Sequence, residues 1–326
     1  MRIRSHLPAG LRRRARDVGR RLGLLTDAAA QGRVQSDLEQ AAKPPVTGPL
    51  RQRQPDRFIE ILACPRCRAR VAGCLAGRLI CQGCGCTYDI VDGVPVLLPE
   101  RCEVIVKPLE HRSNPVPDGM IRWLESVGGY SLNLGAGATE FVLDRCVELE
   151  HAIFRNTDVV GDAHRLPFAD GVFEAVLCLN TFEHLRDPRG AAAELLRVMR
   201  PGGRLVLKTA FLQPVHEEPH HFYDATEYGL LAWFENFRIE RCFVPADMSP
   251  ALALGWFATE LLHYAGIHEG PAAGDRLAAS TLAEWRLMWL DATARRGELW
   301  DAVQSLPPEI QGRMSAGFQL EAVKPG

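Results

Sequence analysis

Four cysteines in two pairs are the side chains of this 326-residue chain whose spacing most directly implies chemistry. Two residues separate Cys64 from Cys67 and Cys81 from Cys84, and thirteen residues lie between the pairs. Two pairs of thiolates on tight turns can meet in the tetrahedral arrangement that Zn2+ accepts. The spacing therefore predicts a structural zinc site in a zinc ribbon at residues 58–100, a segment too short to fold on its apolar area alone.

Two further cysteines leave the ligand set open to an alternative. Cys74 lies between the pairs, and Cys86 can replace Cys84 if the second turn is shifted in register. The C-x2-C spacing favours Cys84. Ten cysteines in a chain without the apolar segment of a secretory signal favour metal or redox chemistry over a disulfide framework, and they predict a cytoplasmic location.

A glycine turn is the second feature that points to a site. "LNLGAGATEF", residues 132–141, places Gly135 and Gly137 directly after a short apolar run. Glycine reaches backbone angles that other residues avoid and lets a ligand approach the main chain, so the turn predicts a site for a nucleoside or phosphate group. A dinucleotide fingerprint needs a small residue at its third glycine position, where this chain has Glu140, and a nicotinamide-dependent dehydrogenase is therefore disfavoured.

Strand-like apolar runs alternate with helix-like periods from residue 116 onward, which predicts an α/β fold with a doubly wound, mostly parallel sheet. One βαβ unit is especially clear. Asp187 and Pro188 supply a helix cap and first turn, apolar residues follow at helical spacing, and Pro201 begins the turn into the next strand. The predicted strands are residues 131–135, 146–150, 157–162, 173–180 and 204–210.

Residues 130–247 resemble the Rossmann-like class of S-adenosylmethionine-dependent methyltransferases, in the small-molecule branch known as type 11. The resemblance rests on four motifs that occur in the family's order: "LNLGAGA", "GDAHRLPF", "EHLRDP" and "RVMRPGG". It implies S-adenosyl-L-methionine as the cofactor and a seven-stranded sheet whose last strand is antiparallel. Residues 237–245 and 317–325 are predicted to form that antiparallel pair.

The resemblance also gives roles to individual residues. Glu150 matches the acid that accepts the ribose hydroxyls, with Glu148 on the same strand face as the alternative, and Asp162 matches the acceptor of the adenine amine. The cofactor-binding residues that the resemblance implies are Gly135, Ala136, Gly137, Glu150, Asp162, Ala163 and Asn180. Only twelve residues separate Gly137 from Glu150, so the first helix of the core is predicted to be short or absent.

The cysteine-rich segment carries a resemblance of its own. Residues 58–100 resemble the small zinc-ribbon proteins that bind and activate methyltransferases of translation. The match includes both cysteine pairs, Gly85, Tyr88 and the stretch "IVDGVPVLLP". It implies either an activating role for the ribbon or a structural knob without a partner.

The loop "FLQPVHEEPHHFYDATEYGLLAWF", residues 211–234, follows the fifth predicted strand, where open sheets of this kind bind ligands. It resembles a segment of methyltransferases often met near glycan and natural-product genes. His216 is predicted as the general base for the acceptor's proton, with His184 as the second choice. Hydrogen bonding to the acceptor, a structural role and a weak metal cluster are the alternatives for the histidines of this loop.

The function predicted from these features is methyl transfer to an oxygen or nitrogen of a small molecule or sugar. RNA methylation guided by the ribbon and a non-catalytic cofactor-binding scaffold are the alternatives. The net charge of −2 makes nucleic acid an unfavoured partner. The apolar stretch at residues 251–266 is interrupted by Glu260 and His263, so no membrane span is predicted. The sequence gives no signal of oligomeric state.

Four segments are predicted along the chain. Residues 1–57 form a basic, flexible leader with eight arginines in its first 22 residues, and residues 58–100 form the ribbon. Residues 101–247 form the cofactor-binding core. Residues 248–326 form a helical lid over the acceptor site and the final strand of the sheet.

Overall fold

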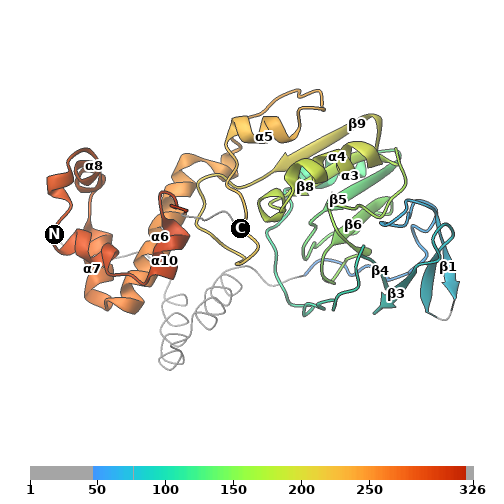
Figure 1. Cartoon of the computed structure of the whole chain (residues 1–326), viewed down its shortest axis with the longest axis horizontal. Helices are drawn as coiled ribbons and strands as arrows, with labels where there is room; N and C mark the ends of the chain where they lie inside the picture. Colours follow the sequence, from blue (N-terminus) through green and yellow to red (C-terminus); the bar gives the residue numbers. More distant parts are fainter. Residues whose placement is uncertain (1–46, 76, 321–326) are drawn as a thin grey trace, which may run out of the picture.

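A computed structural model of the chain describes residues 47–75 and 77–320 (Figure 1). The arginine-rich start of the predicted leader and residues 321–325 of the predicted last strand lie outside the described residues. The strands are β1 (Val71–Leu75), β2 (Arg78–Cys81), β3 (Thr87–Val91), β4 (Val94–Leu97), β5 (Tyr130–Leu134), β6 (Cys146–Glu150), β7 (Val159–Gly161), β8 (Phe173–Leu179) and β9 (Met199–Lys208). The α-helices are α3 (Asp118–Glu125), α4 (Pro188–Val198), α5 (Glu227–Trp233), α6 (Pro250–His268), α7 (Pro271–Ala279), α8 (Leu282–Leu290), α9 (Glu298–Gln304) and α10 (Pro308–Met314).

Five parallel strands form the larger part of the sheet, in the order β7-β6-β5-β8-β9, and β9 lies at its edge. β5 lies in the middle, because Leu132 is paired with Val147 of β6 on one side and with Val176 of β8 on the other. After β5 the chain adds β6 and β7 on one side of it, and then β8 and β9 on the other side. This change of direction defines a doubly wound sheet. The predicted α/β fold class is therefore confirmed, and the loops after all five strands meet at one edge.

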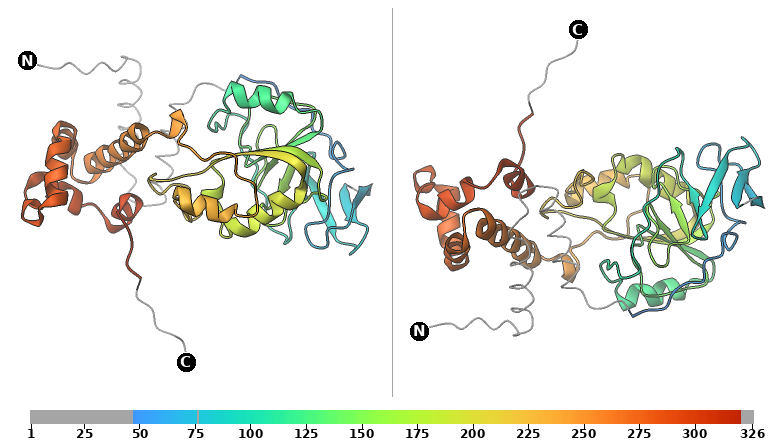
Figure 2. Two further views of the ribbon diagram at one scale, coloured as in Figure 1. Left: turned by 90° about the horizontal axis from the view of Figure 1, so that it is seen from above. Right: turned by 90° about the horizontal axis from the view of Figure 1, so that it is seen from below.

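Helices cover both faces of this sheet. Figure 2 shows α3 on one face and α4 and α5 on the other. Alternate residues of β8 follow this division: Leu177 packs in a cluster with Leu124 of α3, whereas Val176 and Cys178 pack in the cluster that contains Leu195 of α4. Residues 135–145 contain no helix, in agreement with the short spacing between the glycine turn and β6.

The predicted seven-stranded sheet with an antiparallel last strand is wrong for the described residues. Residues 238–245 and 317–320 contain no strand, and the chain enters α6 at Pro250. The apolar side chains that suggested a strand, Phe243 and Val244, are 60% and 68% exposed, so no buried sheet face receives them. Strand propensity reflects packing against a partner more than a backbone preference, and without a packed face it does not fix a strand.

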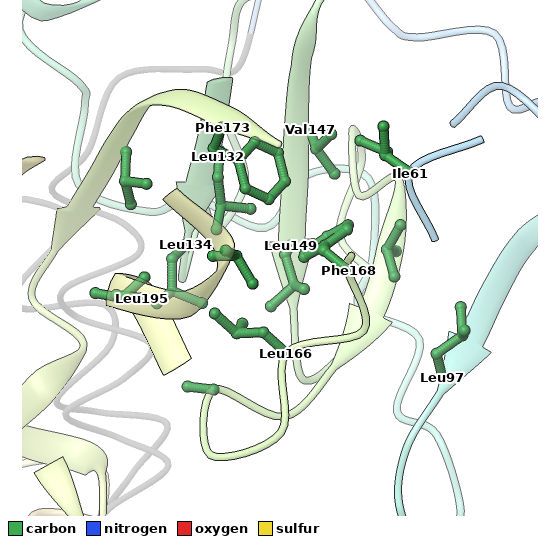
Figure 3. Close-up of a cluster of buried hydrophobic side chains, with 14 of the residues drawn as sticks. Ile61, Leu97, Leu132, Leu134, Val147, Leu149, Leu166, Phe168, Phe173 and Leu195 are labelled. Atoms are coloured by element: carbon green, nitrogen blue, oxygen red, sulfur yellow. The ribbon is translucent and has the colours of Figure 1, made fainter. Parts of the chain in front are cut away.

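Four strands of the nine-stranded sheet come from the cysteine-rich segment. β1 to β4 pair antiparallel in succession, and β4 then runs parallel to β7, with Val96 opposite Val160. The hydrophobic core is continuous across this junction. Ile61 and Leu97 from the ribbon segment belong to the same buried cluster as Leu149 of β6 (Figure 3). The ribbon is thus an extension of the main sheet.

Residues 47–57 are tied to the core by a buried arginine. Arg51 is 5% exposed, and its Nε lies 3.3 Å from Oδ1 of Asp158. Its Nη2 donates to the backbone carbonyls of Leu143 and Cys146, and its backbone N–H donates to Asn156 at 2.8 Å. The end of the segment predicted as leader therefore covers the start of β6 and the loop before it.

The C-terminal helices form a second, smaller core beside the sheet. Tyr264 of α6, Leu277 of α7 and Ile310 of α10 are buried together, apart from the cluster under the sheet (Figure 1). Arg313 at the end of α10 joins this region to the loop after β9, since its carbonyl accepts from the N–H of Val215 at 2.8 Å. Within residues 47–75 and 77–320, no helix is both long enough and apolar enough to cross a membrane.

Candidate cofactor and acceptor site

The glycine turn after β5 has left-handed backbone angles at both predicted glycines. Gly135 has φ +67° and Gly137 has φ +64°, a region that side-chain-bearing residues rarely adopt. A Cβ on Gly135 would lie 2.0 Å from Oγ1 of Thr181, and a Cβ on Gly137 would lie 2.5 Å from Oγ of Ser113. Glycine is therefore required at both positions by angle and by space.

Ser113 covers the glycine turn from the segment before α3. Its hydroxyl accepts from the N–H of Ala138 at 2.8 Å, so it satisfies a backbone donor of the turn. A hollow of about 810 Å³ lies on the ribbon and is lined by residues such as Tyr88 and Asp89, whereas the space at the turn is filled by side chains. A ligand at the turn would take the place of the Ser113 hydroxyl or lie beneath it.

Glu150 stands at the carboxyl end of β6, beside the glycine turn. Its Oε1 accepts from the N–H of Gly137 at 2.7 Å, and its Oε2 accepts from the N–H of His151 at 3.0 Å. Nδ1 of His151 also lies 3.0 Å from Oε2, and because a carboxylate offers about four acceptor positions, about one remains for a further donor. Glu148, the alternative, is fully buried, and its Oε2 accepts from Asn133 and Thr139. Through these two bonds the buried Glu148 holds Asn133 of β5 and Thr139 of the loop that follows the glycine turn.

Burial raises the pKa of Glu148 to about 8, and the nearby carboxylate of Asp158 adds to the effect. The folded chain then holds a proton that the unfolded chain has lost above about pH 4.5, so stability falls as pH rises through this window. Glu148→Gln keeps the volume and the acceptor oxygen but removes the titration. We expect the variant to be more stable than the wild type at about pH 8, by on the order of 2 kcal/mol, as measured by urea unfolding. The prediction is contradicted if the free energy of unfolding of Glu148→Gln falls with rising pH as steeply as that of the wild type.

Asp162 forms a short turn with His164 after β7. Its Oδ1 accepts from the backbone N–H of His164 at 2.9 Å and lies 2.7 Å from the Nδ1 of the same residue. The bond from the His164 side chain lowers the pKa of Asp162, so the carboxylate is charged. Nε2 of His164 accepts from the N–H of Asp187 and links this turn to the start of α4. The other Asp162 oxygen is the one left to a ligand, and the backbone of Ala163 lies in the same turn.

Asn180 follows β8 in a strained conformation. Its φ is +51°, and its N–H donates to the carbonyl of Lys208 at 3.0 Å. Its side-chain Oδ1 is buried and has no hydrogen-bond partner among the residues that the structure describes. A buried polar atom without a partner is costly, and strain of this kind concentrates at binding sites. Both features fit a residue that faces a bound ligand.

The two predicted catalytic histidines are brought together next to Asn180. The ring centroids of His184 and His216 are 5.2 Å apart, and His221 lies 4.3 Å from His216. Nδ1 of His216 contacts the carbonyl of Pro214 at 2.9 Å, and Nδ1 of His184 contacts the carbonyl of His220 at 3.0 Å. A carbonyl can only accept, so each Nδ1 donates its N–H, and in the neutral form of either ring Nε2 is left as an acceptor.

Burial lowers the pKa of His216 to about 4, despite the opposing effect of the Pro214 carbonyl. The imidazole is therefore neutral at pH 7. Trp256 of α6 lies over it at 5.3 Å between ring centroids. Trp256 thus covers one side of the His216 ring.

The four predicted cysteine ligands meet at the end of β2. Their sulfur atoms all lie within 4.8 Å of one another, with Cys64 and Cys84 at 3.7 Å and Cys67 and Cys81 at 3.4 Å. Burial alone would raise the pKa of Cys81, but the N–H groups of Cys84 and Gly83 and the neighbouring thiols lower it to about 7. The sulfur of Cys86 lies beside Arg66 and outside this group, and the side chain of Cys74 is not described. The donor set fits a tetrahedral four-cysteine zinc site.

Sequence reasoning missed four residues around these sites. Ser113 lies in an irregular segment and carried no signal. His164 and Glu183 stand inside recognised motifs, "GDAH" and "EHL", where they were available as candidates. Thr209, directly after β9, donates its hydroxyl to Oε2 of Glu183 at 2.9 Å, a contact between two loops that spacing along the chain cannot reveal.

The strand order, the glycine turn after the central strand and the polar groups at the carboxyl edge define a doubly wound α/β protein of the nucleotide-binding kind. Residues 130–207 match the family model described as a methyltransferase domain, and residues 56–93 match that of Trm112p-like proteins. The chain thus carries a methyltransferase domain preceded by a Trm112p-like domain, and the resemblance predicted from the sequence is confirmed for these segments.

Curated relatives share a short stretch with this chain. The demethylmenaquinone methyltransferase of Mycolicibacterium vanbaalenii is 53% identical over 49 residues, which is 15% of this chain and 22% of the relative. That of Paenarthrobacter aurescens is 43% identical over 74 residues, 23% of this chain and 28% of the relative. The chain therefore spans only about a fifth to a quarter of the length of these relatives. Among solved structures, the YcgJ protein of Bacillus subtilis is 19% identical, with 36% of this chain and 65% of that chain covered and a TM-score of 0.29.

Proposed function

We propose that this protein is a methyltransferase that uses S-adenosylmethionine and transfers the methyl group to an oxygen or nitrogen of a small molecule or sugar. The observation that carries the proposal is the convergence of four motif loops at the carboxyl edge of the parallel sheet. These loops contribute Glu150, Asp162, Asn180 and the glycine turn. The class of reaction rests on the match of residues 130–207 to the methyltransferase domain. The roles of individual residues rest on the geometry of the site.

Seven residues are proposed to hold the cofactor, which supplies an electrophilic methyl group on a sulfonium when bound. Gly135, Ala136 and Gly137 would receive the methionine part, because glycine on either side of Ala136 leaves the main chain of the turn without covering Cβ atoms of its own. Glu150 would accept from a ribose hydroxyl at its remaining acceptor position. The other three proposed contacts are Asp162 and Ala163 for the adenine and Asn180, whose buried Oδ1 needs a donor.

His216 and His184 are proposed to act on the acceptor. Methyl transfer from a sulfonium is an in-line displacement, so the protein supplies mainly orientation and, for a hydroxyl or amine, an acceptor for the departing proton. The Nε2 atom of His216 is a neutral acceptor that Trp256 shields from solvent. His184 lies next to it and is the second candidate.

The four cysteines of the ribbon are proposed to bind one structural Zn2+. Their sulfur atoms already lie within 4.8 Å of one another, as a tetrahedral zinc site requires. Because β4 pairs with β7, the zinc site would stabilise the edge of the methyltransferase sheet rather than a separate module.

The cofactor site is tested by removing one carboxylate at a time. Glu150→Ala and Asp162→Ala are each expected to weaken S-adenosylmethionine binding by about 10- to 150-fold, because a hydrogen bond to a charged acceptor contributes about 1.5–3 kcal/mol. Isothermal titration calorimetry measures the change.

Glu174→Ala is the matched control for these variants. Glu174 lies near the amino end of β8, at the opposite edge of the sheet, where its Oε2 accepts from the N–H of Gly129 at 2.7 Å. Its removal should leave the affinity unchanged. Unchanged affinity in Glu150→Ala or Asp162→Ala would exclude that residue from the site, and a wild-type protein that binds neither S-adenosylmethionine nor S-adenosylhomocysteine would overturn the proposed function.

A further inference from the structure

We propose that Glu183, His184 and His216 form a binding site for a divalent first-row transition metal ion at the acceptor side of the sheet. One potential ligand atom from each residue lies within 4.8 Å of the other two. We call these residues the His–His–Glu triad. It lies outside the four-cysteine site, and it combines the loop after β8 with the loop after β9.

Both histidines are oriented as metal-binding histidines usually are. A histidine that binds a metal through one ring nitrogen typically donates the N–H of the other to a carbonyl or carboxylate, which fixes the tautomer and the ring. His184 does so toward the carbonyl of His220 at 3.0 Å, and His216 toward that of Pro214 at 2.9 Å. Each ring therefore offers a lone pair on Nε2.

The carboxylate of Glu183 supplies the observation that calls for a cation. Glu183 is fully buried, and its Oε2 accepts the hydroxyl of Thr209. Its Oε1 has no hydrogen-bond partner in the described part of the chain. A buried carboxylate oxygen without a partner is costly, and buried charges are normally paired or bound to a metal. A cation held with the two imidazoles would satisfy this oxygen.

His221 plays a positioning role beside the triad. Its Nδ1 accepts from the backbone N–H of His216 at 3.2 Å, so its proton lies on Nε2, which points toward Asp224 at 3.4 Å. This leaves His221 without a free lone pair for a metal. The contact fixes the backbone of His216 instead.

The ligand set indicates the class of ion. Two neutral imidazoles and one carboxylate suit Zn2+, Fe2+, Co2+ or Mn2+, and leave open positions for an exogenous ligand. Ligand bonds of about 2.0–2.2 Å place the ligand atoms of one ion within about 4.4 Å of one another, close to the 4.8 Å that bounds the separations in the triad. If the proposed function holds, an acceptor hydroxyl would take an open position, where its pKa would be lower and its proton would pass to solvent. Nε2 of His216 would then bind the metal, and the metal would replace it as the activating group.

Cobalt titration of the full chain tests the site. Protein that carries one equivalent of Zn2+ on the ribbon is titrated with Co2+, and bound metal is counted after gel filtration. We expect one further equivalent of Co2+, with visible d–d absorption and without a thiolate charge-transfer band. No second equivalent, or a spectrum with thiolate charge transfer, would overturn the proposal.

Three variants make the test specific. His184→Ala is expected to lose the second equivalent, whereas His220→Ala, on an exposed histidine of the same loop whose carbonyl is kept, should retain it. Glu183→Gln keeps the acceptor for Thr209 and should weaken Co2+ binding by at least about 10-fold, which covers the case that His184→Ala does not fold. Wild-type Co2+ binding in Glu183→Gln would contradict the triad.

Binding of S-adenosylhomocysteine, measured on the same samples, separates this proposal from the proposed function. Normal binding of S-adenosylhomocysteine without a second metal overturns the metal site alone. A second metal without binding of S-adenosylhomocysteine overturns the proposed function and leaves the metal site standing.

Discussion

Serine in place of Cys81 is expected to abolish the proposed zinc binding and to destabilise the methyltransferase core together with the ribbon. The sulfur of Cys81 lies 3.4 Å from that of Cys67 and accepts two backbone N–H groups, so its loss opens the site and its turn. Ligation of a structural zinc contributes on the order of 10 kcal/mol in small domains. Because the ribbon and the sheet share one hydrophobic cluster, the free energy of unfolding of the whole core should fall by more than about 3 kcal/mol.

Metal analysis and thermal unfolding measure the two parts of this result. Cys102→Ser is the matched control, because Cys102 is exposed and lies outside the cysteine group. Cys86→Ser tests the shifted register and should keep the zinc. If Cys86→Ser loses as much zinc as Cys81→Ser, the ligand set must include Cys86. If zinc-free Cys81→Ser keeps the wild-type melting transition of the core, the shared cluster does not couple the stability of the two regions.

His216→Ala is expected to lower turnover by about 100-fold or more while cofactor affinity stays near that of the wild type. The residue lies beside His184 in the loop after β9, and Trp256 covers one side of its ring. Removal of the imidazole takes away either the base that receives the proton or a metal ligand beside the methyl-accepting substrate. Both losses affect the chemical step. A methyl-transfer screen over sugars and small-molecule hydroxyls and amines supplies the substrate for the assay.

His220→Ala serves as the control for turnover, because its side chain is exposed on the same loop. It should lower the rate far less. A complex with S-adenosylhomocysteine gives a structural check, in which the His216 imidazole is expected to face the space beside the sulfur. If the imidazole is turned away from a closed cleft, His216 is not the general base. That role then falls to His184 or to no residue.

Local spacing was enough to predict the strands of the parallel sheet and helix α4. The runs that became β5, β6, β7 and β8 were identified because a buried strand leaves a short apolar run between turn residues. Asp187 caps α4 as expected, since its side chain accepts from the N–H of Gly190. The cysteine group followed from two C-x2-C turns, which fix each pair locally and leave only the meeting of the pairs to the fold.

The edges of the sheet show where such reasoning fails. A strand at an edge depends on a partner that is distant in sequence, and the apolar side chains within residues 238–245 do not find one among the described residues. The opposite edge was missed for the same reason. β4 was assigned to a separate ribbon, but its register with β7 places Val96 against Val160 and joins the two cores.

The sequence by itself determined the doubly wound class, the glycine turn, the motif residues at the carboxyl edge and the four cysteines, because each depends on residues close together in the chain. Only the tertiary structure decided which groups meet: Ser113 on the glycine turn, Arg51 against Asp158, and Thr209 on the Glu183 carboxylate that lies beside His216. These contacts join loops that are far apart in sequence. Their geometry depends on how the sheet packs and on the need to pair buried polar atoms. Neither can be predicted from the spacing of residues along the chain.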